Sequence, residues 1–109
     1  MLFHPTLDVC AILEGSTIKV FNLAAHENDL LATISVDDFY PSSFAFIDGG
    51  NSLAICGNKP FIVLHCLKRM KSARLLLPAG CKSTSWVTCS PDQKTWAFTD
   101  GGKRIFLVK

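Results

Sequence analysis

The chain has 109 residues, the size of one ordinary domain, and a net charge of +2 at pH 7. Apolar residues make up 49% of it and charged residues 18%, which argues against a disordered chain, and so small a net charge does not by itself indicate nucleic-acid binding. No apolar run is long enough to span a membrane and no basic segment precedes an apolar core at the start, so we expect no signal peptide and an intracellular protein.

Short segments rich in β-forming residues alternate with turn residues and predict three successive units of antiparallel strands. The first unit, residues 1–36, has strands expected at 1–4, 9–13, 17–23 and 30–36. The second, residues 41–79, has strands expected at 43–47, 52–56, 61–67 and 73–77. The third, residues 84–109, has strands expected at 85–89, 95–99 and 104–108 and lacks its outer strand. Turn sequences such as Asp48-Gly-Gly-Asn51 separate the strands.

The three units align without a gap at a spacing of 43 residues. One register contains Ala11, Ala54 and Ala97, and another contains Val20, Val63 and Phe106. A repeat of about 40–45 residues made of short strands is the period of a β-propeller blade. The strands are apolar almost throughout, which indicates that both faces of each sheet are covered. We therefore predict an all-β fold of β-propeller blades with four antiparallel strands each, in an incomplete ring, with Ala54 and Ala97 buried against neighbouring sheets.

Two segments, Ser90–Phe98 and Gly15–Leu23, resemble the turn and strand signatures of WD-repeat β-propellers. The Trp-Asp pair that ends the third strand of a blade in that family is replaced here by Phe21-Asn22, Leu64-His65 and Leu107-Val108, and the family's Gly-His pair is absent. The resemblance covers nearly the whole chain. It implies a rigid scaffold that binds proteins or peptides on its rims, without catalysis.

The number of blades is unusual, because closed propellers have about 4–8 blades and this chain supplies two nearly complete blades and three strands of another. The chain is therefore either a fragment of a longer propeller or one part of a ring that other chains complete. In both cases its end blades expose apolar faces, and such faces mark interfaces. We expect protein partners or the remaining propeller blades to cover them, and we expect the isolated chain to self-associate.

A basic stretch, Lys68, Arg69, Lys71 and Arg74, is expected in the connection between the third and fourth strands of the second blade. One interpretation is a solvated loop, and a second is contact with an acidic protein surface. A third is binding of an anion, RNA or a phosphoinositide headgroup, although no aromatic residue lies in the run to stack on a base. Trp86 aligns with the start of an inner strand. It is either a rim aromatic that anchors a peptide or, the alternative we favour, a residue buried against the neighbouring blade.

Catalytic and metal-binding patterns are absent from the sequence. The histidines His4, His26 and His65 have no metal-ligand spacing, and no serine lies in a Gly-x-Ser-x-Gly elbow. The five cysteines, an odd number without a C-x-x-C pair, are expected to be thiols. We therefore expect no catalytic residue, no metal and no cofactor, and interpret the chain as a non-enzymatic protein–protein interaction scaffold. The alternative is an anion, RNA or phosphoinositide binding module that uses residues 68–74, and an enzyme comes third.

Overall fold

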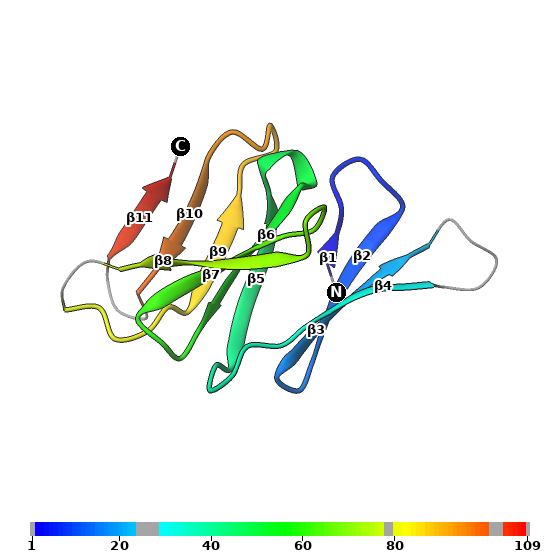
Figure 1. The fold of residues 1–109 in the computed structure, drawn as a ribbon. Coiled ribbons are helices and arrows are strands. Elements are labelled where there is room, and N and C mark those ends of the chain that lie inside the picture. The colour runs from blue at the N-terminus through cyan, green and yellow to red at the C-terminus, as the bar shows by residue number, and fades with distance from the viewer. Residues whose placement is uncertain (1, 24–28, 78–79, 101–103, 109) are drawn as a thin grey trace.

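The computed structural model, which describes residues 2–23, 29–77, 80–100 and 104–108, consists of antiparallel strands in three separate sheets (Figure 1). Within these residues the helical structure is limited to one 3-10 turn, η1 (Asp48–Gly50). The predicted all-β fold is confirmed, and the three sheets of the described chain do not close into a ring.

Each sheet contains strands that are consecutive in the sequence. The first sheet has the order β1-β2-β3-β4 and comprises β1 (Leu2–Phe3), β2 (Val9–Glu14), β3 (Thr17–Asn22) and β4 (Asp29–Ile34). The second has the order β5-β6-β7-β8 and comprises β5 (Pro41–Ile47), β6 (Ser52–Gly57), β7 (Phe61–Cys66) and β8 (Lys71–Leu76). The third has the order β11-β10-β9 and comprises β9 (Trp86–Cys89), β10 (Trp96–Thr99) and β11 (Ile105–Val108). Each sheet is therefore a meander in which strands that follow one another in the sequence lie side by side.

The first strands of the three sheets lie on a common inner side. β1 packs beside β5, β5 packs beside β9, and all three line one hollow of about 570 Å³. The sheets extend outward from this side, and their faces are turned toward one another (Figure 1). This is the arrangement expected of neighbouring propeller blades.

Two layers of apolar side chains fill the spaces between the sheets. The layer between the first and second sheets includes Ala11, Ile18, Val20, Leu53 and Ile55. The layer between the second and third sheets includes Ala54, Ile62, Val87, Trp96 and Phe98. Successive residues of β6 thus belong to opposite layers, because side chains alternate between the two faces of a strand. The middle sheet is covered on both faces, which explains why its strands are apolar almost throughout.

The gapless alignment is wrong for the third strand of the first repeat. In the second and third sheets Ala54 pairs with Leu64 and Ala97 with Leu107, whereas in the first sheet Ala11 pairs with Val20. The cause is turn length, because residues 15–16 link β2 to β3 whereas the longer segment 58–60 links β6 to β7. Val20 therefore takes the place of Leu64, whereas the 43-residue spacing assigns that place to Phe21, one residue later.

Ala97 also departs from its predicted environment. Ala11 and Ala54 are fully buried, because a neighbouring sheet covers each of them. Ala97 is only partly buried, so the prediction that it is pressed against another sheet is wrong. It lies on the side of the third sheet that no described sheet covers.

Replacement of Ala54 by leucine is expected to lower the free energy of unfolding by about 1–3 kcal/mol, because the larger side chain overpacks the layer between the second and third sheets. Ala97→Leu is the matched control, since it makes the same change at the same repeat position on an uncovered face. Urea denaturation followed by circular dichroism measures both variants. Equal losses of stability would contradict the packing of the middle sheet.

Candidate functional site

The third sheet presents an apolar face to solvent. Ile105, Leu107 and Trp86 are 71%, 68% and 63% exposed. Strand pairing places Leu107 opposite Ala97, and Ile105 and Trp86 on either side of Thr99, so these side chains share one face. This open face of the third sheet (Trp86, Ala97, Ile105 and Leu107) points away from the second sheet.

The first sheet has an open apolar face as well. Phe3 pairs with Cys10, Cys10 with Phe21, and Phe21 with Leu30, which places them on the side away from the second sheet. Phe3 and Leu30 are exposed. The row of three sheets therefore ends in an open face of the first sheet (Phe3, Phe21 and Leu30, which surround the buried Cys10) and the open face of the third sheet.

The two open faces match the two halves of an interface that the molecule already contains. The 43-residue spacing relates Ala97 and Leu107 to Ala54 and Leu64, which the third sheet covers. On the open face of the first sheet, Cys10 of β2 lies 43 residues before Leu53 of β6. This face therefore corresponds to the side of the second sheet that contains Leu53 and packs against the first sheet. Each open face thus has the composition of a surface that binds a sheet elsewhere in the molecule.

Trp86 is exposed, so the favoured expectation that it is buried against the next blade is wrong. No described sheet lies on its side of the third sheet to cover it. The residue also lines the hollow beside β1, β5 and β9. The role of Trp86 as a rim aromatic that anchors a peptide stays a prediction.

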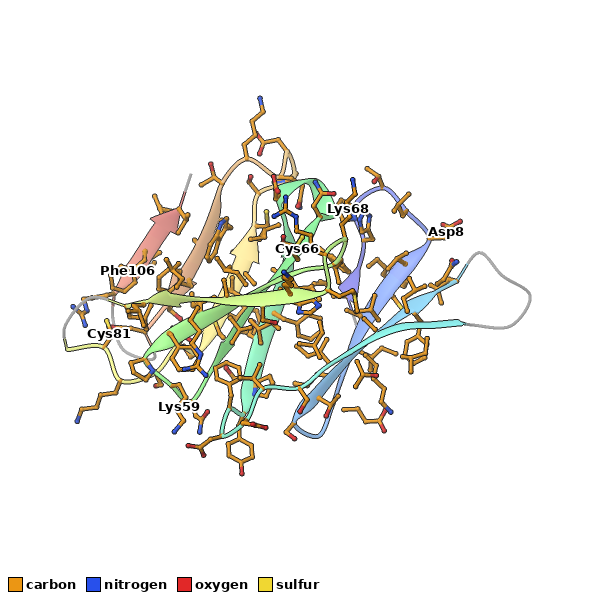
Figure 2. The ribbon with its side chains drawn as sticks, viewed as in Figure 1. Asp8, Lys59, Cys66, Lys68, Cys81 and Phe106 are labelled. Atoms are coloured by element: carbon orange, nitrogen blue, oxygen red, sulfur yellow. The ribbon has the colours of Figure 1, made fainter. Side chains whose placement is uncertain are left out.

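The basic stretch is divided between a turn and a strand. Lys68 (labelled in Figure 2) and Arg69 lie in the turn after β7. Lys71 and Arg74 lie on β8, which begins two residues before the expected strand at 73–77. Because Lys71 and Arg74 are three residues apart in a strand, their side chains leave opposite faces of the sheet. The guanidinium of Arg74 lies 4.5 Å from the centre of the Phe61 ring. The four cations therefore do not form one continuous patch.

Polar contacts fix the third sheet against the second. The backbone N–H of Gly57 donates to Thr84 Oγ1 at 3.0 Å, and the backbone N–H of Thr84 donates to the Gly57 carbonyl at 3.0 Å. The N–H of Val87 donates to Ser43 Oγ at 3.2 Å. The first two bonds join the end of β6 to the segment that precedes β9, and the third joins the inner strands β5 and β9. Together they fix the third sheet beside the second.

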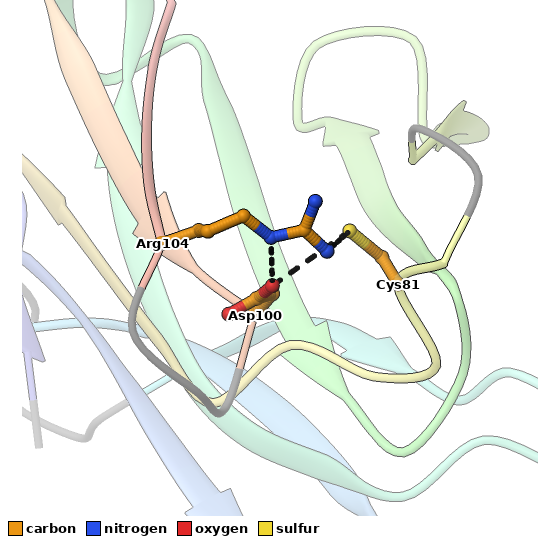
Figure 3. Close-up of polar contacts among 3 residues, drawn as sticks. All are labelled: Cys81, Asp100 and Arg104. Atoms are coloured by element: carbon orange, nitrogen blue, oxygen red, sulfur yellow. Dashed lines mark hydrogen bonds and ion pairs between the residues drawn. The ribbon is translucent and has the colours of Figure 1, made fainter.

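A cluster that sequence reasoning missed consists of Cys81, Asp100 and Arg104 (Figure 3). Arg104 Nε donates to Asp100 Oδ2 at 2.7 Å, and Arg104 Nη2 donates to Cys81 Sγ at 3.1 Å. The hydrogen bond to Asp100, aided by the negative charge of that carboxylate, raises the pKa of Arg104. The cluster ties the segment that precedes the third sheet to Asp100, directly after β10, and Arg104, directly before β11. Cys81 lies 19 residues from Asp100 and 23 residues from Arg104, so no local sequence motif predicts the contact.

His4 joins the first sheet to the second. Its Nδ1 atom accepts the backbone N–H groups of Thr6 and Leu7 at 3.1 and 3.0 Å, which leaves Nε2 to donate to the Gly50 carbonyl at 3.1 Å. The imidazole also packs edge-on against the ring of Phe46. A histidine without metal-ligand spacing thus has a structural role, fixing the β1–β2 turn beside η1.

His65 is a second structural histidine, and it is buried within the middle sheet. Its Nδ1 atom lies 2.7 Å from Ser72 Oγ, and its Nε2 atom is buried with no hydrogen-bond partner among the described residues. Burial lowers the pKa of His65 below its ordinary value of 6.5. The folded protein therefore favours the neutral imidazole.

The free energy of unfolding is expected to fall as the pH is lowered through the region below 6.5, because the unfolded chain then protonates His65 while the folded chain resists it. Above 6.5 both states carry neutral His65 and this effect is absent. Denaturant titrations from about pH 7.5 to about pH 5.5 measure the difference between the wild type and His65→Gln, which keeps a polar group near Ser72 but does not titrate. A constant difference across this range would contradict the assignment.

The five cysteines are all free thiols, as expected. Burial raises the pKa of Cys56 to about 11, which makes its thiol unreactive at neutral pH. In the described ranges, no three His, Cys, Asp or Glu side chains are grouped to hold a metal ion. No helix of this part of the chain has the length and apolar character needed to cross a membrane.

The comparison with solved structures identifies the fold. The chain is similar to the β-propeller domain of Cps50 (Swd1) from Myceliophteria thermophila, with a TM-score of 0.68 and 16% identity over 84% of this chain and 31% of that one. The chain has the fold of part of a β-propeller. It is also similar to a chain in the crystal structure of a mitotic checkpoint complex, with a TM-score of 0.63 and 13% identity over 84% of this chain and 28% of that one.

This partial propeller spans about a third of the length of the solved structures it matches. These similarities confirm the resemblance to WD-repeat β-propellers at the level of the fold. No protein-family model matches the sequence, and no curated protein matches it.

Proposed function

We propose that the chain is a non-catalytic protein–protein interaction scaffold whose open sheet faces bind further β-propeller blades. The observation that carries this proposal is the open face of the third sheet, where three large apolar side chains are mostly exposed at the position that a blade covers in the middle of the molecule. Full burial of a leucine or isoleucine side chain is favourable by about 1.5–3 kcal/mol before the entropic costs of binding.

Binding of RNA or a phosphoinositide headgroup by residues 68–74 has less support. Lys71 and Arg74 leave opposite faces of β8, and Arg74 stacks on Phe61. An anion therefore meets two cations of the stretch in the turn rather than four. The free thiols support a further proposal, an intracellular location, since disulfides are rare in reducing compartments.

Sedimentation velocity over a range of concentrations tests the scaffold proposal. The isolated chain is expected to self-associate, and Leu107→Asp is expected to weaken the association about tenfold or more, since it places a charge on the open face of the third sheet. Leu76→Asp is the matched control, because Leu76 is also highly exposed but lies on the outer strand β8 of the middle sheet.

A wild-type chain that stays monomeric at high concentration, without binding a dye for exposed apolar surface, would overturn the proposal. So would equal weakening of association by Leu107→Asp and Leu76→Asp.

A further inference from the structure

A groove of about 370 Å³ lies between the first and second sheets, at the end of the molecule that carries the β1–β2 and β7–β8 turns. The first sheet contributes Leu7, Val9 and Leu31 to its lining, and the second contributes Leu67 and Met70. The groove is separate from both open faces, since Leu31 borders it whereas the adjacent Leu30 pairs with Phe21 on the other side of the first sheet.

The walls of the groove are held in place before any partner binds. His4 fixes the β1–β2 turn through Thr6 and Leu7 and bonds to Gly50 of η1 across the junction of the two sheets. The backbone N–H of Leu67 donates to the carbonyl of Asn51 at 3.0 Å, which joins the β7–β8 turn to η1. A preformed site lowers the entropic cost of binding.

The lining is mostly apolar and is accessible to a partner. Leu7, Leu31 and Met70 are 62%, 50% and 51% exposed, although they border the same hollow. The methionine side chain adapts readily to different apolar groups. A volume near the lower end of the range of about 300–1,000 Å³ for ligand sites suits one or two side chains of a peptide.

The charge at the groove has one sign. Lys68 is the only charged side chain among the described residues that line it, and Arg69 follows in the same turn. Neither forms an ion pair with a described residue, whereas Lys19 and Lys59 pair with Glu14 and Asp38. The adjoining turns contain Asp8 and Asp48, but these two do not line the groove. A carboxylate brought to the groove thus meets an ammonium group that forms no ion pair with the described residues.

We propose that this groove binds an acidic peptide segment of a partner protein, with a large apolar side chain of the peptide in the groove and a carboxylate beside Lys68. This proposal rests on the scaffold function and specifies the chemistry of one partner. It assigns Lys68 and Arg69 a contact with protein and leaves the open faces to blade docking.

Selection from a phage-displayed library of random peptides of about 12 residues, against the immobilised chain, tests the proposal. Enriched peptides are expected to combine Asp or Glu with large apolar residues. Synthetic copies labelled with a fluorophore should bind with an affinity that falls as salt rises, and Lys68→Glu should weaken them about tenfold or more. Leu31→Asp should weaken peptide binding as strongly. It places a negative charge, which repels the acidic peptide, in an apolar part of the groove.

Leu30→Asp is the matched control, since the neighbouring leucine has similar exposure but lies on the open face of the first sheet. Leu30→Asp is expected to weaken self-association and leave peptide binding intact. Leu31→Asp is expected to weaken peptide binding and leave self-association intact. Failure of the groove proposal can therefore be distinguished from failure of the scaffold proposal. Circular dichroism confirms that each variant is folded.

Failure to enrich any peptide, or enriched peptides that bind Lys68→Glu and Leu31→Asp like the wild type, would overturn the groove proposal. Binding to phosphatidylserine vesicles that Lys68→Glu abolishes, without peptide binding, would assign the turn to a membrane surface instead.

Discussion

Replacement of Phe98 by alanine is expected to lower the free energy of unfolding by about 3–5 kcal/mol and to release the third sheet from the second. Phe98 is buried in the layer between these sheets, where its ring centre lies 5.0 Å from that of Phe106 and 5.8 Å from that of Trp96. Alanine leaves a cavity in the layer and removes both ring contacts.

The two tryptophans make this release measurable, because Trp86 and Trp96 both lie in the third sheet. Fluorescence thus reports on the third sheet, whereas far-ultraviolet circular dichroism reports on all three. In Phe98→Ala the fluorescence transition is expected at a lower urea concentration than the dichroism transition. Phe3→Ala, at an exposed position, is the control and should change stability by no more than about 0.5 kcal/mol. An unchanged midpoint in Phe98→Ala would contradict the packing of the second layer.

Replacement of Gly50 by alanine is expected to cost about 2–5 kcal/mol of stability for two separate reasons. Gly50 has a φ of 91°, a left-handed conformation that costs a residue with a side chain about 1–2 kcal/mol. A Cβ atom at this position would also overlap the imidazole of His4, and overpacking costs about 1–3 kcal/mol more. The change should therefore loosen the junction of the first and second sheets.

The adjacent Gly49 separates these two reasons. It has a φ of 66°, but a Cβ atom there meets nothing within 4 Å. Gly49→Ala is therefore expected to show the conformational cost alone, about 1–2 kcal/mol. Thermal and urea denaturation of the two variants give the difference. If Gly50→Ala were no less stable than Gly49→Ala, the close approach of His4 to η1 would be refuted.

Local sequence patterns were sufficient to predict the strands. Turn residues such as Gly15 and Asp48-Gly-Gly-Asn51 separate short apolar runs, and the expected strand at 61–67 is β7 (Phe61–Cys66). The 43-residue spacing holds for the first two strands of each sheet because they pair in the same register, as in Leu2 with Ala11, Ala45 with Ala54 and Thr88 with Ala97.

The remaining features depend on contacts between distant residues. The offset of Val20 follows from one residue of turn length, which a gapless alignment cannot represent. The exposure of Trp86 and Ala97 follows from the lack of a described sheet beside the third one, and repeat positions alone treat end blades like middle ones. The groove beside Lys68 forms only when the β7–β8 turn meets the first sheet.

The two open faces differ from each other, so the two ends of the row of sheets are not equivalent. The open face of the third sheet corresponds to one side of an internal interface, and the open face of the first sheet corresponds to the other side. Copies that dock through them therefore stack head to tail and have no two-fold axis. Each addition leaves one free surface of each kind, so growth stops only where the accumulated rotation brings the last copy back to the first. The angle between successive sheets thus determines whether such an assembly is a bounded ring or an unbounded filament.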